Sequence, residues 1–306
     1  MTNFRKTLCD YPGGKATHMP EILPNVPKKA TGIIEVYGGA ANLLLAIGKR
    51  PLKVYNDMNG DMTNLFAQLR DLESASELQR MLTFTLYSEE SLRQALATWH
   101  DMSKTAVERA WATFVILRMA RYPFTTGQEG FARASQYHAN EVRGGGKTSP
   151  SKLFPSKVDR LWELVNEIRT WDVPCQCEAV TVINAFDRPG NLLYCDPPYL
   201  RKQRGRNSDA PLYGVEMMGE GEHMALLDAL KRTTAAMRLV SHYPCELYDA
   251  LLGAGWTHHT YQAGTNGKPR EERLYICPRT AVALQHDKRR GAGQQMVMSA
   301  IIEAIT

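Results

Sequence analysis

The chain has 306 residues, of which 43% are hydrophobic and 23% are charged, so it is long enough for a large core with one inserted or appended domain. It has no apolar run of about 18 residues, and its first residues lack the apolar stretch of an export signal, so we expect a cytoplasmic protein that does not cross a membrane. The formal net charge of +5 suits a polyanionic partner, although a basic balance alone is weak evidence for one.

The first regular elements are expected between residues 31 and 60. Residues 31–39 are β-branched and apolar and predict a strand, residues 40–50 suit a helix, and residues 51–57 predict a second strand. This order is one βα unit that leads into a neighbouring strand.

Long helices are expected from about residue 61 to 122, because apolar side chains recur there every three or four residues, for example at Leu65, Leu69, Ala110 and Phe114. Residues 123–157 are rich in Gly, Ser, Thr and Pro and carry several cations, which predicts a mobile basic loop. A further helix is expected near residues 157–171.

Alternation of strands and helices resumes after this segment. Strands are expected at residues 179–184, 191–196, 237–243 and 273–278, and helices at residues 223–234 and 245–255. An α/β core interrupted by about a hundred helical and loop residues predicts a discontinuous catalytic domain with an inserted recognition module. We expect these parts at residues 1–60 and 176–280 for the core, 61–175 for the insertion, and 281–306 for a C-terminal tail with a basic linker and a short helix.

The most informative motif is Asp196-Pro197-Pro198-Tyr199, which follows an apolar strand. Ligands of open α/β sheets bind at the carboxyl ends of the strands, where this motif would lie. The two prolines remove backbone donors, so the Asp196 carboxylate and the Pro197 carbonyl form a rigid group of acceptors for the two N–H groups of an exocyclic amine. Such acceptors stabilise the positive charge that grows on the nitrogen when it attacks a methyl group on sulfur, and this chemistry needs no metal.

Tyr199 offers an aromatic face on which a base removed from a duplex could stack, a contact worth about 1–3 kcal/mol. The exocyclic amine of adenine is inaccessible inside the duplex, so the chemistry implies that the base is flipped out. His223 and His242 follow the motif, and we expect them to be structural because this reaction needs acceptors rather than a proton shuttle.

The strand followed by Asp-Pro-Pro-Tyr resembles the catalytic motif of amino-methyltransferases, and residues from about 9 to 280 resemble the Dam-like, phage-type (D12 class) DNA adenine N6-methyltransferases. This resemblance implies a Rossmann-like α/β core dependent on S-adenosylmethionine (SAM), with an inserted, mainly helical target-recognition domain. It also implies double-stranded DNA as the partner. The later segments Tyr213–Glu216, Ser241–Tyr243 and Glu272–Tyr275 follow the family's order.

Two further segments resemble the family's cofactor-binding motifs. Tyr11 and Lys15 lie in an aromatic-x-Gly-Gly-Lys segment and are implied to contact SAM, Lys15 as a charge that can meet its carboxylate. A glycine-rich turn after the first strand lets the backbone approach the cofactor, and an acid at the end of the second strand can accept from ribose hydroxyls. These residues are Tyr37, Gly38, Gly39 and Asp57, with Asp196 also at the cofactor, whereas Ala41 replaces the family's last glycine.

Cations near the proposed base pocket and in the helical insertion are the candidates for DNA contacts. Arginine can bond guanine in a bidentate manner while lysine mostly meets phosphate, so the arginines are the better candidates for reading sequence. The candidates are Arg118, Arg121, Arg133, Arg143, Lys147, Arg201, Arg204 and Arg206.

Other functions remain open from the sequence. The same acceptor motif serves methyltransferases that act on cytosine N4, on RNA adenine or on protein glutamine, although Asp196 and the motif order favour adenine in DNA. A catalytically silent DNA-binding homologue is a further alternative, supported by Ala41 alone. The six cysteines lack the paired spacing of a zinc site, so we expect free thiols and no metal.

Overall fold

The computed structural model describes residues 8, 11, 13–121, 123, 130–132, 150–200, 219–263 and 270–289. Seven strands of these residues form one sheet in the order β3-β2-β1-β4-β5-β7-β6, in which β7 runs antiparallel to β5 and β6 and the other pairs are parallel. The strands are β1 (Gly32–Glu35), β2 (Leu52–Asn56), β3 (Asp172–Cys175), β4 (Asn191–Cys195), β5 (Met237–His242), β6 (Thr257–Ala263) and β7 (Arg270–Ile276).

Strand β1 shows why the centre of the sheet forms from nearly continuous apolar sequence. Ile33 packs into the core on one face, and its neighbour Ile34 packs into the core on the other. Leu192 and Leu193 of β4 divide between the two faces in the same way. Because both faces of a parallel sheet are covered, its strands need apolar residues at consecutive positions.

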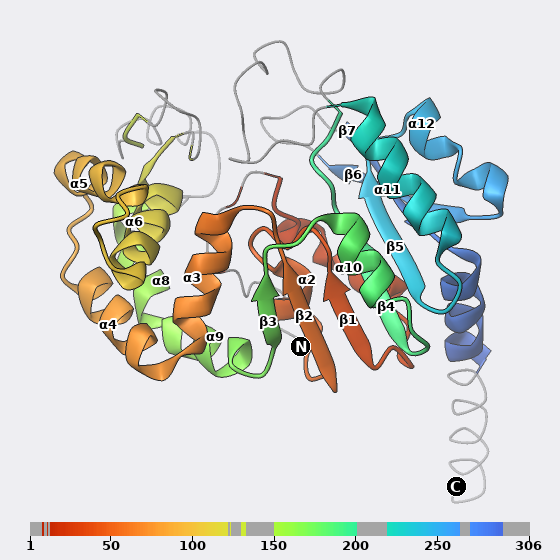
Figure 1. The fold of residues 1–306 in the computed structure, drawn as a ribbon, viewed down its shortest axis with the longest axis horizontal. Coiled ribbons are helices and arrows are strands. Elements are labelled where there is room, and N and C mark those ends of the chain that lie inside the picture. The colour runs from red at the N-terminus through yellow and green to blue at the C-terminus, as the bar shows by residue number, and fades with distance from the viewer. Residues whose placement is uncertain are drawn as a thin grey trace, which may run out of the picture.

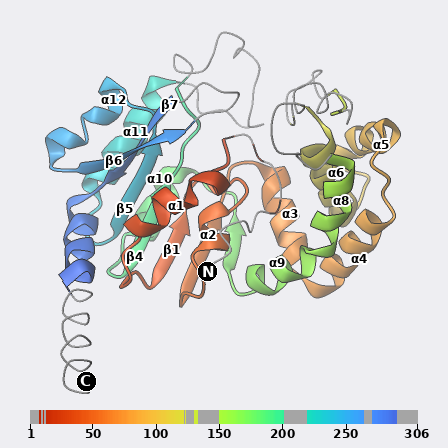
Figure 2. The ribbon, with the colours of Figure 1, turned by 180° about the vertical axis from the view of Figure 1, so that it is seen from behind.

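Helices cover both faces of the sheet. Figure 1 shows α10 (Ala179–Ala185) and α11 (Glu220–Arg232) on one face, and Figure 2 shows α1 (Met19–Ile22) and α2 (Asn42–Ala46) on the other. Helix α12 (Glu246–Asp249) and the short 3-10 turns Ala16–His18, Leu23–Asn25 and Leu252–Ala254 complete this part of the molecule. The arrangement confirms the expected α/β fold with a Rossmann-like core.

A group of helices lies between β2 and β3 in the sequence and beside the β3 edge of the sheet, at the left of Figure 1. Side-chain caps begin several of them: Asn59 accepts from backbone N–H groups of α3, Ser88 does so in α5, and Thr105 and Glu108 form a capping box in α6. These helices are α3 (Gly60–Arg70), α4 (Leu72–Thr83), α5 (Glu89–Trp99), α6 (Ala106–Met119), α8 (Pro150–Asp159) and α9 (Leu161–Ile168).

The helical group and the sheet share a core. One apolar cluster runs from Leu43 of α2 through Phe66 of α3 to Phe114 of α6. The helices therefore lie where the sequence predicts an insertion, and the shared apolar core holds them against the sheet. The limits of the catalytic and recognition parts at residues 60 and 175 remain a prediction.

Several expected elements were wrong. Residues 179–184, predicted as a strand, form α10, because Val182 and Ile183 are buried on the helix-covered face, and packing there outweighs the strand preference of β-branched residues. Strands β3 and β6 were not predicted: β3 is short and contains Pro174, and β6 exposes most of its residues. The expected helices at residues 40–50 and 245–255 are shorter, with α2 and α12 five and four residues long.

The expected basic linker after residue 281 is helical as far as the structure describes it. Residues 278–289 form one helix, which buries Ala283 in the core and places the Asp287 carboxylate 2.7 Å from the backbone N–H of Lys28. Cys177, Cys195, Cys245 and Cys277 are free thiols, as expected. No helix in the described part of the chain combines the length and apolar character needed to cross a membrane.

Candidate active site

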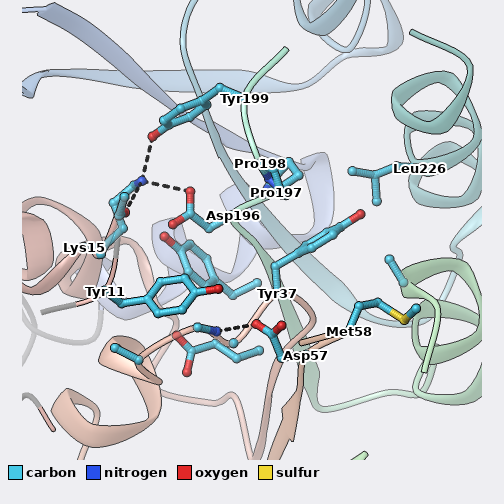
Figure 3. A pocket seen from close by; sticks show the side chains of 18 of the residues that line it. Tyr11, Lys15, Tyr37, Asp57, Met58, Asp196, Pro197, Pro198, Tyr199 and Leu226 are labelled. Carbon is cyan, nitrogen blue, oxygen red and sulfur yellow. Dashed lines mark hydrogen bonds and ion pairs between the residues drawn. The ribbon is translucent and has the colours of Figure 1, made fainter. Parts of the chain in front are cut away.

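A cavity of about 330 Å³ opens at the carboxyl ends of β1, β2 and β4 (Figure 3). The glycine-rich turn follows β1, Asp57 follows β2, and Asp196 follows β4, which pairs directly with β1. From β1 the chain continues to β2 on one side, and from β4 it continues to β5 on the other side. Ligands of open α/β folds bind at the point between two such strands. All of the predicted catalytic and cofactor-binding residues line it: Tyr11, Lys15, Tyr37, Gly38, Gly39, Asp57, Asp196, Pro197, Pro198 and Tyr199.

The turn after β1 needs its two glycines for different reasons. A Cβ on Gly38 would lie 2.2 Å from a ring carbon of the buried Tyr55, so a side chain does not fit. Gly39 has φ +47, in the left-handed region that favours glycine. Ala41 stands where the family motif has its last glycine. It also adopts the left-handed region, with φ 54 and ψ 40.

Asp57 holds this turn in place. Its carboxylate accepts hydrogen bonds from the backbone N–H of Gly39 at 2.6 Å and of Asn59 at 2.7 Å. Burial raises the pKa of Asp57, and these two N–H groups oppose the rise. The carboxylate predicted to meet a ribose is therefore fixed against the glycine-rich turn at the cavity wall.

Glu35, the last residue of β1, was missed as a site residue although its motif was identified. It is buried in the cavity wall, and its carboxylate accepts from the backbone N–H groups of Leu43 at 3.1 Å and Leu44 at 3.2 Å. Burial raises the pKa of Glu35 to about 8, against these two bonds from the start of α2. Glu35 thus ties β1 to the helix that follows the glycine-rich turn.

Lys15 joins three parts of the chain that are distant in sequence. Its ammonium lies 2.9 Å from Asp196 Oδ1 and 3.2 Å from Glu272 Oε1, and it donates a hydrogen bond to the Tyr199 hydroxyl at 2.7 Å. The Tyr199 hydroxyl donates in turn to Glu272 Oε1 at 2.9 Å. The contact of Lys15 with the cofactor's carboxylate stays a prediction, and in the structure its ammonium contacts Asp196 and Tyr199 of the Asp-Pro-Pro-Tyr motif (Figure 3).

Glu272 is a second residue that the sequence reasoning did not place in the site. It lies on β7 with 1% of its surface exposed, and its Oε1 contacts both Lys15 and Tyr199. In the sequence analysis Glu272 appears only in the segment Glu272–Tyr275, because nothing local to residues 270–276 indicates its partners. A charged residue at a buried strand position was the one signal that could have identified it.

Burial and charge compete at these groups. Burial raises the pKa of Asp196 to about 6, Lys15 opposes the rise, and Glu272 adds to it. Burial disfavours the charge of Lys15, but Asp196, Tyr199 and Glu272 together raise its pKa well above the ordinary value. The cluster therefore keeps a positive charge beside a carboxylate that loses its proton around pH 6.

The ring of Tyr199 is packed from the protein side. Its centroid lies 4.1 Å from that of Tyr243, with 34° between the planes, and 5.4 Å from that of His242. The Arg270 guanidinium lies 4.3 Å from the centre of the Tyr243 ring. Tyr199 is therefore held by its hydroxyl and by its ring, which fixes it at the cavity.

His223 and His242 lie behind this wall. His223 Nδ1 is 2.7 Å from the Tyr248 hydroxyl, and the His242 ring stacks on Tyr248 with centroids 3.7 Å apart. Burial lowers the pKa of His242 to about 3, so the ring is neutral near pH 7. Both are buried, and their contacts agree with the structural part predicted for them.

The candidate DNA-binding residues are described only in part. Arg121 is exposed just after α6, where its backbone N–H donates to the carbonyl of Gly130, whereas Arg118 is 9% exposed and offers little surface to a polyanion. The residues Arg133, Arg143, Lys147, Arg201, Arg204 and Arg206 lie outside the described residues. Over the described ranges, no group of three or more His, Cys, Asp or Glu side chains is placed to hold a metal ion.

Comparison with known families agrees with this geometry. A model of the D12 class N6 adenine-specific DNA methyltransferases matches residues 11–252. The match begins at Tyr11 and extends beyond Tyr243, which packs on Tyr199. A search of curated proteins found no match to this sequence. The family match spans most of the chain and contains every residue of the cavity wall, and the chain therefore belongs to the D12 class of N6 adenine-specific DNA methyltransferases.

Proposed function

We propose that this DNA adenine methyltransferase uses SAM and methylates N6 of an adenine that is flipped out of double-stranded DNA at a specific sequence. One observation carries the proposal: a single cavity joins the acceptor motif at Asp196 to the glycine-rich turn and to Asp57. A site for an exocyclic amine and a site for a nucleoside cofactor are thus continuous, as methyl transfer between two bound molecules requires.

The residues present fit a nucleoside cofactor with an amino-acid tail. Gly38 keeps the turn clear of side chains, Tyr37 and Tyr11 offer aromatic surface, and the Asp57 carboxylate can accept from ribose hydroxyls. When bound there, SAM would supply an electrophilic methyl group on a positively charged sulfur. The alanine at position 41 does not require a different turn for cofactor binding, because Ala41 already adopts the left-handed conformation.

Asp196 is the acceptor that we assign to the target amine. Its carboxylate and the Pro197 carbonyl can hold the two N–H groups of N6, which directs the nitrogen lone pair toward the methyl group. Lys15 bonds one oxygen of this carboxylate and fixes its orientation, and Glu272 fixes Lys15 and Tyr199. Negative charge on Asp196 stabilises the amine as it becomes positive.

Tyr199 is the surface that we assign to the flipped base. Tyr243 packs on its ring, so adenine would stack on the remaining face or displace Tyr243. The cations after Tyr199 and in the segment 61–175 are proposed to contact phosphate and bases, with Arg121 the described candidate. The helical group beside β3 would then be the recognition part of the enzyme.

Substitution of the acid tests this mechanism. Asp196→Ala should reduce methyl transfer by about three orders of magnitude or more, because the acceptor of a developing charge is lost. Binding of S-adenosylhomocysteine, measured by calorimetry, should remain detectable in this variant. Substantial methyl transfer by Asp196→Ala would exclude the acceptor mechanism, and loss of all nucleoside binding would show that the acid supports the cavity instead.

A further inference from the structure

Arg270 is an exposed cation at the same edge of the sheet as the cavity. It is the first residue of β7, which runs antiparallel to β5, so the start of β7 lies beside the carboxyl end of β5. Strand β5 is parallel to its neighbour β4, and the motif that ends in Tyr199 follows β4. The topology therefore brings Arg270 to the edge of the sheet where Tyr199 lines the cavity.

Ring contacts join Arg270 to the catalytic motif. Its guanidinium lies 4.3 Å from the centre of the Tyr243 ring, and the ring centroids of Tyr243 and Tyr199 are 4.1 Å apart. One aromatic ring thus separates this charge from the surface assigned to the flipped base. A guanidinium stacks on a ring through its face, whereas it binds an anion through the N–H groups at its edge. Stacking on Tyr243 therefore orients Arg270 in a way that is compatible with binding an anion.

Two neighbouring cations are committed to carboxylates. Lys15 is 4% exposed and forms two ion pairs in the cavity wall. Arg273 forms ion pairs with Asp249 and Glu271. A flipped base stays attached through its sugar to the phosphates on either side, so these phosphates come to the mouth of the cavity with it. Their negative charge favours an exposed cation at this edge, and Arg270 is one.

We propose that Arg270 binds a DNA phosphate next to the flipped adenine, an inference that rests on the function proposed above. The contact is electrostatic and does not depend on the base sequence, because phosphates are the same at every position. It also links the DNA backbone to the stack of Tyr243 on Tyr199, so the same group of side chains holds the backbone and the base. Arg270 is thus a positioning residue that takes no part in the methyl transfer itself.

The salt dependence of DNA binding separates a phosphate contact from a packing role. Arg270→Ala should weaken binding of a duplex that the enzyme methylates by about tenfold, and should reduce the magnitude of the slope of log K against log salt concentration by about one. Arg270→Lys should keep the wild-type slope because the charge remains. Arg279→Ala is the matched control, since Arg279 is exposed just beyond the other end of β7. S-adenosylhomocysteine should bind all three variants as tightly as it binds the wild-type enzyme.

Modified DNA locates the phosphate. Uncharged methylphosphonates in place of the phosphates on the two sides of the target adenine should weaken binding to the wild-type enzyme and have little further effect on Arg270→Ala. An equal loss of binding in both enzymes would overturn the proposal, because the contact with Arg270 would then lie elsewhere.

Other results would also contradict this role. Wild-type affinity and slope in Arg270→Ala, or an equal change in Arg279→Ala, would overturn the phosphate contact. A slower methyl transfer by Arg270→Ala with an unchanged slope would show that the residue only supports Tyr243, which also overturns it. A wild-type enzyme that binds no duplex DNA would instead contradict the proposed function, and with it this contact.

Discussion

Asp196 and Lys15 form the pair on which the proposed chemistry depends. They are 2.9 Å apart in a buried wall, where a charge is costly unless a partner of opposite charge is close. The lysine therefore makes an ionised acid possible at the place where positive charge develops. This arrangement explains why a lysine from the first motif is needed beside a motif almost two hundred residues later.

The raised pKa of Asp196 predicts an acid limit to the reaction. Its pKa is about 6, and a protonated acid is a poorer acceptor for its N–H group and no longer stabilises positive charge. The rate of methyl transfer under single-turnover conditions should therefore be constant above about pH 7 and fall as the pH drops through about 6. A rate that stays level down to pH 4 would show that the carboxylate need not be ionised.

Glu272 should set the position of that limit. Its negative charge raises the pKa of Asp196, so Glu272→Gln should move the acid limb of the rate profile to lower pH while keeping the shape of the side chain. The matched control is Glu271→Gln, the preceding residue of β7, whose carboxylate bonds Arg273. If the acid limb of the rate profile does not move in Glu272→Gln, or moves equally in Glu271→Gln, a direct effect of Glu272 on Asp196 is contradicted.

At the scale of elements, the turn between β1 and α2 is the most constrained segment. Gly38 lies against Tyr55, and Glu35 and Asp57 hold the two ends of the turn by backbone N–H groups. Contacts within the protein therefore hold the turn in one conformation. A preformed loop avoids the entropic cost of ordering it on binding.

Gly38→Ala should damage both folding and cofactor binding. The added Cβ would lie 2.2 Å from the Tyr55 ring, and forcing it into a filled core should lower the free energy of unfolding by about 1–3 kcal/mol. Gly253→Ala is the control, because a Cβ there meets no atom within 4 Å. Thermal unfolding and binding of S-adenosylhomocysteine measure both effects, and wild-type values for Gly38→Ala would contradict the packing described.

The elements that the sequence predicted well are those with strong local signals. β1, β2, β4, β5 and β7 have β-branched or apolar runs, and the long helices have apolar residues at helical spacing. α10 was taken for a strand because Val180, Val182 and Ile183 favour strands locally, and only their packing beneath α11 makes them helical. β6 carries too few buried residues to be recognised.

The site was predicted as a set of motifs but not as a network. Asp57 and Gly39 follow from the order of strand, turn and acid, which is local information. The contacts of Lys15 with Asp196 and Glu272 join residues from three distant segments, so no spacing rule gives them.

On the scale of the whole molecule, the proposed chemistry takes place at the sheet, which has helices on its faces and the helical group beside one edge. The helices α10 and α11 lie on one side of the cavity's strands, and the helical group begins with α3 directly after Asp57. The cavity lies at the carboxyl ends of β1, β2 and β4, and the helical group lies beside the β3 edge of the same sheet (Figure 1). Under the function proposed above, this arrangement would let the molecule hold duplex DNA while one base enters the cavity.

The identity of the methylated base tests the central claim most directly. The enzyme would be incubated with SAM labelled in its methyl group and with unmethylated duplex DNA, and the DNA would be digested to nucleosides and analysed by mass. We predict label in N6-methyladenine, with Asp196→Ala giving none above background. Label in N4-methylcytosine, or transfer to RNA or protein but not to DNA, would contradict the assignment of adenine in duplex DNA as the substrate.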